Sequence, residues 1–212
     1  NSPGEDDQNT YWDIKKTILF RMEPYMEKDP DTWGVWAKPD REDEFFRVLK
    51  HSQGDYNNIE WHLSKTLQEL SQNPPPTKTQ GNRISAVLSN KYRDIGHQKR
   101  INFAQYIDNQ VGLNLDVWGS PKWEWKHYKG TLPYHTKDNA LFPYKYTFNA
   151  ENNKIPGYFT EKLIDGILAE CLTFYWGDPG VREFLPPGAW IQLDLSDFKV
   201  DSAKMRCCIE NN

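Results

Sequence analysis

The stretch TEKLIDGILAE, residues 160–170, begins with three polar residues and continues with the apolar spacing of an amphipathic helix. Thr160 can cap this helix through its hydroxyl group, and Glu161 in the first turn interacts favourably with the helix dipole. Lys162 opposes the dipole, at a cost of roughly 0.3–1 kcal/mol at an exposed site. A bound anion would make the position of Lys162 favourable, because free backbone N–H groups, the dipole and one ammonium group could together hold a diphosphate.

The residues before this helix carry more polar groups than capping requires. The stretch ENNKIPGY, residues 151–158, contains a carboxylate, two adjacent amides and a tyrosine. An ordinary capped helix with Lys162 in solvent would explain the helix start alone, and spacing by itself favours that simpler explanation. The residues 151–162 are therefore a candidate phosphate site that needs support from the surrounding elements.

The expected strands and helices alternate along the chain as in a parallel α/β sheet. In such sheets, ligands bind beyond the carboxyl ends of the strands. The break NPPPTKTQGNR, residues 73–83, indicates a domain boundary, since three prolines stiffen the chain into a spacer. We expect a first lobe over residues 1–75, a linker over 76–82 and a second domain over 83–212. The first lobe has a buried strand at Ile18–Phe20, a weak helix signal in EDEFFRVLK and a helix in NNIEWHLSKTLQELSQ. Strands are expected in RISAVLSN, LNLDVWG, LFPYKYTFNAE, CLTFYWG and AWIQLDL, and helices in HQKRINFAQYIDN and TEKLIDGILAE.

The stretch YKYTFNAENNKIPGYFTEKLIDGILAECLTFYWGDP resembles the donor-binding signature of the family 10 glycosyltransferases, the α-1,3-fucosyltransferases. FLPPGAWIQLDLSDF, AVLSNKYRDIGHQKRINF and LDVWG resemble further strands of that family, so the resemblance covers roughly residues 83–200. It departs from the animal enzymes in lacking their paired cysteines and glycosylation sequons. The signature residues that match are Glu151, Asn152, Tyr158, Thr160, Glu161, Lys162, Leu163 and Gly177.

The resemblance implies a two-lobed GT-B fold, with a Rossmann-type donor domain and a smaller acceptor lobe whose amino-terminal half is shortened or absent. It also implies roles for residues. Arg100 and Lys162 would neutralise the diphosphate, as a planar fork and a point charge respectively. Glu161 and Asn152 would bind hydroxyl groups of the sugar or ribose, beside Thr160, and Tyr158 would pack against the donor. FRMEPYM resembles the family's strand that leads to the catalytic base, which would be Glu23.

The implied activity is an inverting glycosyl transfer, with fucose from GDP-fucose as the expected sugar and a glycan or glycoprotein as acceptor. Two alternatives stay open: a carbohydrate-binding module without catalysis, and a transferase that uses another nucleotide sugar. A dinucleotide enzyme would need a G-x-G-x-x-G fingerprint, which the sequence lacks. The aromatic and basic stretch WEWKHYKG, residues 123–130, could close over the donor or be an ordinary loop.

Composition limits the other partners. A net charge of −4 provides no global basic field for nucleic acid, and no apolar run approaches the length of a membrane span. The five histidines lack paired ligand spacing and the only Asp-x-Asp lies in a loop, so we expect no metal and no cofactor. Three cysteines and no sequon favour a reducing, cytoplasmic location.

Overall fold

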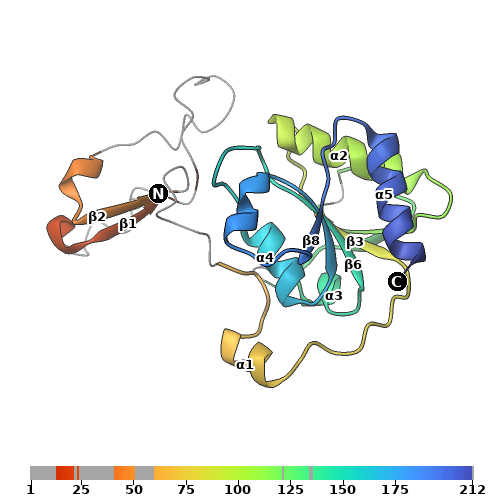
Figure 1. The fold of residues 1–212 in the computed structure, drawn as a ribbon, viewed down its shortest axis with the longest axis horizontal. Coiled ribbons are helices and arrows are strands. Elements are labelled where there is room, and N and C mark those ends of the chain that lie inside the picture. Colours follow the sequence, from red (N-terminus) through yellow and green to blue (C-terminus); the bar gives the residue numbers. More distant parts are fainter. Residues whose placement is uncertain are drawn as a thin grey trace. The chain divides into compact units, whose positions relative to one another are not determined.

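The chain forms two compact units in the computed structural model, which describes residues 13–21, 23, 41–50, 60–120, 122–133 and 136–211 (Figure 1). The smaller unit comprises residues 1–58 and 155–158, and the larger unit comprises residues 59–154 and 159–212. Each unit has a parallel sheet of its own.

The larger unit is built on a six-stranded sheet in the order β5-β4-β3-β6-β7-β8, and every neighbouring pair is parallel. This confirms the expected α/β class with a Rossmann-type parallel sheet. The central strands are buried on both faces, as parallel strands covered by helices must be. The strands are β3 (Ile84–Leu88), β4 (Leu115–Gly119), β5 (Tyr128–Gly130), β6 (Tyr146–Ala150), β7 (Leu172–Trp176) and β8 (Trp190–Gln192).

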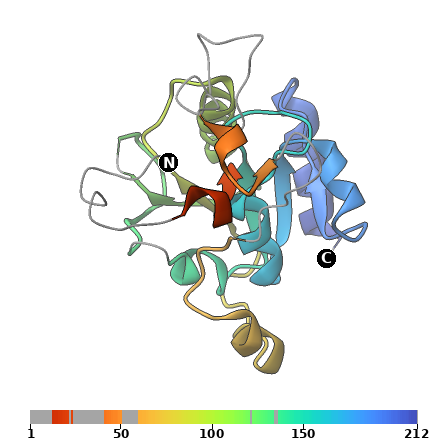
Figure 2. The ribbon, with the colours of Figure 1, turned by 90° about the vertical axis from the view of Figure 1, so that its left-hand side faces the viewer.

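Helices cover both faces of this sheet (Figures 1 and 2). On one face, α2 (Ile95–Asp108) and α5 (Phe198–Glu210) pack over a core that includes Ile101, Phe148 and Met205. On the other face lie α3 (Asp138–Leu141) and α4 (Glu161–Leu168), and α4 buries Leu163 against Tyr175 of β7. The short helix α1 (Leu67–Gln72) lies at the edge of the second face.

The chain direction across the sheet reverses between β3 and β6. From β3 the chain proceeds outwards to β4 and β5, and then returns to β6 and continues through β7 to β8. β3 pairs with β4 over all five of its residues, but with β6 only at Ile84 and Ser85. The carboxyl halves of β3 and β6 are therefore not paired with each other at the switch point, where open α/β sheets bind their ligands.

In the part of the smaller unit that the structure describes, the strands β1 (Ile18–Arg21) and β2 (Arg47–Lys50) pair in parallel. The strand expected at Ile18–Phe20 is present, but the expectation that it is buried is wrong, because Ile18 and Phe20 are exposed. The helix expected in residues 42–50 is wrong, because this segment forms a 3-10 turn at Glu42–Glu44 followed by β2. The pairing of Val48 and Leu49 with β1 overrides a weak local helix signal.

The division between the units also differs from the expected boundary. The units separate between residues 58 and 59, whereas the sequence suggested a linker at residues 76–82, which begins at the end of the proline run 74–76. Residues 60–82 pack on the larger unit because Leu63 joins a cluster with Leu141, and the Lys78 ammonium group donates to the carbonyl oxygen of Ala169. The helix expected from residue 59 begins only at Leu67, after a capping box made by Thr66 and Glu69.

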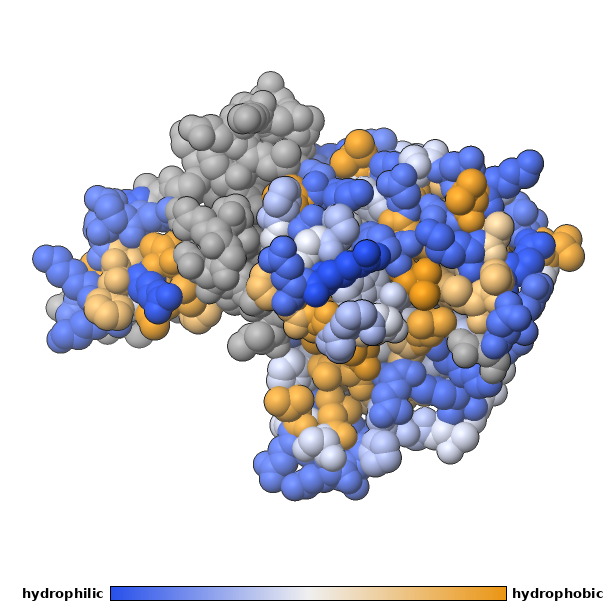
Figure 3. Space-filling model, viewed as in Figure 1, coloured by the Kyte–Doolittle hydropathy of each residue, from blue (hydrophilic) through white to orange (hydrophobic). Residues whose placement is uncertain are grey.

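The surface near α1 is hydrophobic. Figure 3 shows apolar residues gathered on the larger unit beside this helix, where Leu67 is 59% exposed. Among the residues that the structure describes, no helix is both long enough and apolar enough to cross a membrane.

Candidate active site

The start of α4 is tied to the end of β6 by a buried carboxylate. Glu151 follows β6 directly and is fully buried. Its oxygens accept hydrogen bonds from the Thr160 backbone N–H at 2.9 Å, the Thr160 hydroxyl at 2.7 Å and the Tyr175 hydroxyl at 3.0 Å. Thr160 caps α4, as expected, by accepting from the Lys162 backbone N–H. Glu151 thus closes the loop 151–160 onto the sheet.

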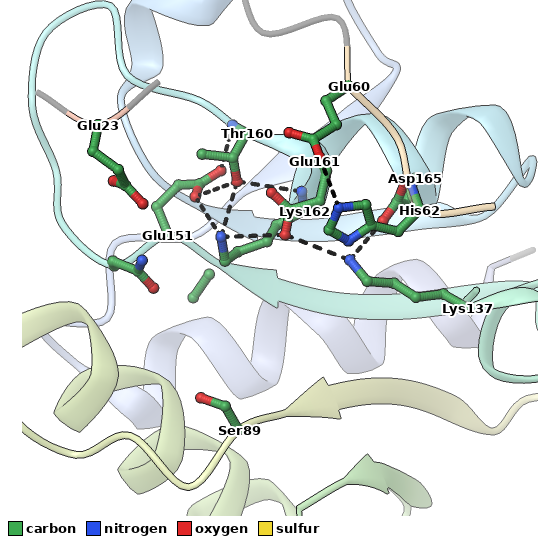
Figure 4. Close-up of polar contacts among 12 residues, drawn as sticks. Glu23, Glu60, His62, Ser89, Lys137, Glu151, Thr160, Glu161, Lys162 and Asp165 are labelled. Atoms are coloured by element: carbon green, nitrogen blue, oxygen red, sulfur yellow. Dashed lines mark hydrogen bonds and ion pairs between the residues drawn. The ribbon is translucent and has the colours of Figure 1, made fainter. Parts of the chain in front are cut away.

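Lys162 turns back from the first turn of α4 towards this carboxylate (Figure 4). Its ammonium nitrogen lies 3.4 Å from an oxygen of Glu151, 3.4 Å from an oxygen of Glu161 and 3.0 Å from the Thr160 hydroxyl. The ammonium group is therefore not an unopposed cation at a helix start. The buried charge of Glu151 compensates its unfavourable position in the dipole.

Glu161 is held between two cations. Lys137 lies 3.6 Å from an oxygen of Glu161 on the side away from Lys162, and it also pairs with Asp165 at 2.6 Å. Asp165 accepts in turn from the backbone N–H of His62. Burial by itself would raise the pKa of Glu161, but Lys162, Lys137 and His62 outweigh it, and the pKa falls from 4.5 to about 2. Glu161 is consequently an ionised hydrogen-bond acceptor at neutral pH.

The start of α2 lies against the same loop. Gly96 leaves room for this approach, because a Cβ atom there would come within 2.2 Å of the carbonyl oxygen of Asn152. The Gly96 N–H donates to that oxygen at 3.1 Å, and the His97 ring nitrogen Nε2 lies 3.0 Å from Oδ1 of Asn152. Burial and the nearby Arg100 lower the pKa of His97 to about 4, so the ring is neutral and Nε2–H can donate to Asn152.

Arg100 spans the opening between β3 and β6. Its guanidinium donates to the carbonyl oxygen of Ala150, the last residue of β6, at 3.0 Å. It also donates to the hydroxyl of Ser89, the residue after β3, at 3.4 Å. The side chain is 5% exposed. The charges of Arg100, Lys91 and Lys162 all contribute to the lowered pKa of His97.

Glu23 and Tyr158 belong to the smaller unit. The Tyr158 hydroxyl donates to Oε2 of Glu23 at 2.9 Å. Because only one residue separates Tyr158 from Thr160, this bond connects the expected base to the loop that leads into α4. The expected packing of Tyr158 on the donor and the role of Glu23 stay predictions.

The structure brings together part of the site expected from the sequence, and the roles of these residues in binding stay predictions. Thr160, Glu161 and Lys162 share contacts with one another, and Asn152 contacts His97, which lies on the same helix as Arg100. The residues of this network to which the sequence assigned no role are Ser89, His97, Lys137, Glu151 and Asp165. Glu151 could have been found from the sequence, because it matches the family signature. Lys137 could not, because only the fold brings it close to Glu161. Within the described ranges, no group of three His, Cys, Asp or Glu side chains could hold a metal ion, and the expectation of a metal-independent reaction stays a prediction.

Comparison with known proteins finds similarity to α1,3-fucosyltransferases in fold and in part of the sequence. No family model matches the chain. The sequence is 36% identical over 73 residues to an α-(1,3)-fucosyltransferase, FucT, of Helicobacter pylori, a match that covers 34% of this chain and 15% of that enzyme. Crystal structures of α1,3-fucosyltransferase align with 95% of the chain, with TM-scores of 0.56 for one structure and 0.55 for another that contains GDP.

The chain has the fold of an α1,3-fucosyltransferase. The resemblance seen in the sequence is confirmed by these findings, although identity to the solved structures is only 15% and 14%. The chain spans 67% of the length of those solved chains. In this fucosyltransferase-like fold, the loops after β3 and β6 provide the residues of the candidate site.

Proposed function

We propose that this chain binds a nucleoside diphosphate sugar at the carboxyl ends of β3 and β6 and transfers the sugar to an acceptor hydroxyl. The observation that carries the proposal is that the starts of α2 and α4 both contact the loop after β6 at the switch point of the sheet, where Gly96 donates to Asn152 and Thr160 donates to Glu151. Arg100 lies on the first of these helices and Lys162 on the second. Helix starts and cations together are the groups that hold phosphates in such folds. A neighbouring α1,3-fucosyltransferase structure contains GDP-fucose, which supports fucose as the sugar.

Both ammonium groups of the site are already paired with carboxylates before a donor binds. Lys162 and Lys137 together face the carboxylates of Glu151, Glu161 and Asp165. A diphosphate would take over part of the ion pairing of Lys162, so that the bound state gains charge-assisted hydrogen bonds without adding a cation. Glu161, released in part from Lys162 but still near Lys137, would accept hydrogen bonds from donor hydroxyl groups.

In the proposed reaction, Glu23 takes the proton of the acceptor hydroxyl. The acceptor oxygen attacks the anomeric carbon, the bond from that carbon to the diphosphate oxygen breaks, and the configuration inverts. GDP leaves with the electron pair, and Arg100 and Lys162 stabilise its developing charge. Tyr158 fixes the orientation of Glu23 by donating to one of its oxygens. The acceptor is proposed to be a glycan or a glycoprotein.

Thermal unfolding with added GDP, UDP, free fucose or no ligand tests this proposal. GDP at about 100 times its dissociation constant should raise the free energy of unfolding by about 2.7 kcal/mol. A carbohydrate-binding module would respond to free fucose and not to GDP, and a larger response to UDP would indicate another nucleotide sugar. Release of GDP from GDP-fucose, with and without glycan acceptors, then tests whether binding leads to transfer.

A further inference from the structure

A segment near the start of the larger unit, residues 60–66, is bonded both to α4 and to the residue that precedes α3. The His62 backbone N–H donates to Oδ1 of Asp165 at 2.7 Å, and the His62 carbonyl oxygen accepts from the Lys137 backbone N–H at 2.7 Å. The Leu63 side chain is buried in the cluster beneath α3. Both backbone groups of His62 are thus used, and the segment has a fixed place on the larger unit.

Asp165 also fixes the ammonium group of Lys137. The carboxylate is buried, and its Oδ2 lies 2.6 Å from the Lys137 ammonium nitrogen, while its Oδ1 accepts from His62. Each oxygen therefore has its own donor, and a rotation of the carboxylate would break both contacts. Because a free lysine side chain samples many rotamers, an anchor of this kind keeps the ammonium group at one position.

Two ammonium groups approach the Glu161 carboxylate from opposite sides (Figure 4). Oε1 of Glu161 lies 3.6 Å from the Lys137 nitrogen and 3.4 Å from the Lys162 nitrogen. The two cations differ in their other partners. Lys162 also pairs with Glu151 at the loop after β6, whereas Lys137 pairs with Asp165 on α4. A ligand that engages Lys162 would therefore leave the contacts of Lys137 in place.

The proposed donor is such a ligand. Its diphosphate would engage Lys162 and weaken the contact of that ammonium group with Glu161. Lys137 would then keep the carboxylate ionised and fixed in direction. An ionised acceptor forms the stronger hydrogen bonds to hydroxyl groups, so the contact of Lys137 matters most when the donor is bound.

We infer that Lys137 is a positioning residue, anchored by Asp165, which holds the Glu161 carboxylate to accept hydrogen bonds from hydroxyl groups of the donor. This inference rests on the proposed function and separates the tasks of the two lysines. Lys162 acts on the diphosphate, and Lys137 acts on the hydroxyl groups through Glu161. The segment 60–66 supports this arrangement, because its His62 shares the carboxylate of Asp165 with Lys137.

Calorimetric titration of GDP-fucose and of inorganic pyrophosphate into the whole chain and its variants tests the inference. Lys137→Met should weaken GDP-fucose binding about tenfold, because Glu161 loses its direction and part of its charge stabilisation. Pyrophosphate binding should stay within about twofold, since it lacks hydroxyl groups. Lys137→Arg should recover at least part of the GDP-fucose affinity, because the cation is restored. Lys145→Met replaces an exposed lysine just before β6 and should bind both ligands like the unaltered chain.

A second variant guards against misfolding. Lys137→Met leaves the buried Asp165 without its cation, which is destabilising by itself. The double variant Lys137→Met/Asp165→Asn removes both charges together, and Oδ1 of the asparagine can still accept from the His62 N–H. Urea unfolding should show that the double variant is folded, and titration should show the same selective loss of GDP-fucose affinity.

Three results would overturn the inference while the proposed function stands. One is unchanged GDP-fucose affinity in the folded double variant. Another is an equal loss of GDP-fucose and pyrophosphate affinity, which would show that Lys137 supports the phosphate site. The third is a Lys137→Arg variant that binds GDP-fucose no better than Lys137→Met, since a positioning cation would then not be the cause. If the unaltered chain binds neither ligand, the proposed function is wrong and the inference fails with it.

Discussion

Glu151 is the residue on which the other charges of the site depend. It is a fully buried carboxylate with three hydrogen-bond donors and one ammonium group around it. Leaving a charge buried and unpaired is strongly destabilising, so the surrounding groups must stay in place for the fold to persist. The loop 151–160 is therefore positioned by electrostatics as much as by its proline and glycine.

This arrangement determines what replacement of Lys162 should do. We expect Lys162→Ala to weaken GDP binding by about 1.5–3 kcal/mol, the worth of a charge-assisted hydrogen bond. We also expect a loss of stability, because Glu151 loses its countercharge but keeps its three donors. Titration calorimetry and urea unfolding measure the two effects.

Lys154→Ala is a matched control from the same loop, since Lys154 only approaches the exposed Asp194, at 3.8 Å, and GDP affinity should not change. Equal affinity of the Lys162 variant and the unaltered chain would exclude Lys162 from the phosphate site.

The pKa of His97 depends on cations of the same site. Burial, Arg100, Lys91 and Lys162 together lower this pKa from 6.5 to about 4. Because the folded value lies below the unfolded one, the contribution to stability is present above pH 6.5 and is lost as the pH falls towards 4. A bound diphosphate would offset the cations and raise the pKa of His97. Titration of the imidazole resonances by NMR, with and without GDP, should show this rise. An unchanged pKa in saturating GDP would place the anion elsewhere.

At the scale of elements, the close approach of α2 to the loop 151–160 depends on one glycine. Gly96→Ala would place a methyl group 2.2 Å from the Asn152 carbonyl oxygen and 2.4 Å from that of Glu151. Backbone atoms held by a sheet cannot move aside as a flexible side chain can, so α2 would have to shift. We expect a loss of at least about 1–3 kcal/mol in the free energy of unfolding, with weaker GDP binding.

Gly180→Ala provides the comparison for this substitution. A methyl group there would meet only the end of the Asp178 side chain, at 2.7 Å, and a small change in that side chain can relieve the contact. Chemical denaturation should show little change for Gly180→Ala and a clear loss for Gly96→Ala. Similar stability of the two variants would mean that α2 does not need this contact to hold its position.

For the whole molecule, the lowered pKa of Glu161 predicts how stability depends on pH. The folded pKa of about 2 lies below the ordinary value of 4.5, so the stabilisation is complete above pH 4.5 and is lost as the pH falls to about 2. This difference in pKa corresponds to about 3 kcal/mol in the free energy of unfolding. Urea unfolding between pH 2 and 7 should therefore show a stability gap between the unaltered chain and Glu161→Gln that narrows below pH 4.5. A gap of constant size would mean that Glu161 is not held by Lys162 and Lys137.

The proposed reaction uses Glu23 of the smaller unit as its base. Glu23→Gln keeps the shape and an acceptor for Tyr158 but cannot take a proton. We expect transfer to fall about 10²-fold or more with GDP affinity unchanged, because a base acts in the transition state. Glu44→Gln, which alters an exposed carboxylate paired with Arg41, is the control in the same unit. If Glu23→Gln retains most of the transfer rate, another carboxylate is the base. Glu27, which lies outside the described residues, would then be tested first.

The sequence alone determined much of the larger unit. Buried strands and the helices at residues 95–108 and 161–168 have strong local signals, because apolar spacing and flanking glycine or polar residues are set within a few positions. The stretch 151–162 was predicted to be a binding loop from the same kind of local signal, since its residues are adjacent in the chain. The helix α5 was missed because its polar residues mask a weak apolar repeat, and β2 was misassigned because it forms only by pairing with β1.

Only the tertiary structure decided which charged and polar groups pair with one another. Lys137 and Glu161 are far apart in the chain, and His62 and Asp165 are separated by more than a hundred residues, yet each pair is brought together where β6 meets α4. No local pattern encodes such contacts, since they depend on strand order and on which helix starts meet at the switch point. For the same reason, the sequence presented Lys162 as an isolated cation, whereas the fold places it against a buried glutamate that follows the neighbouring strand.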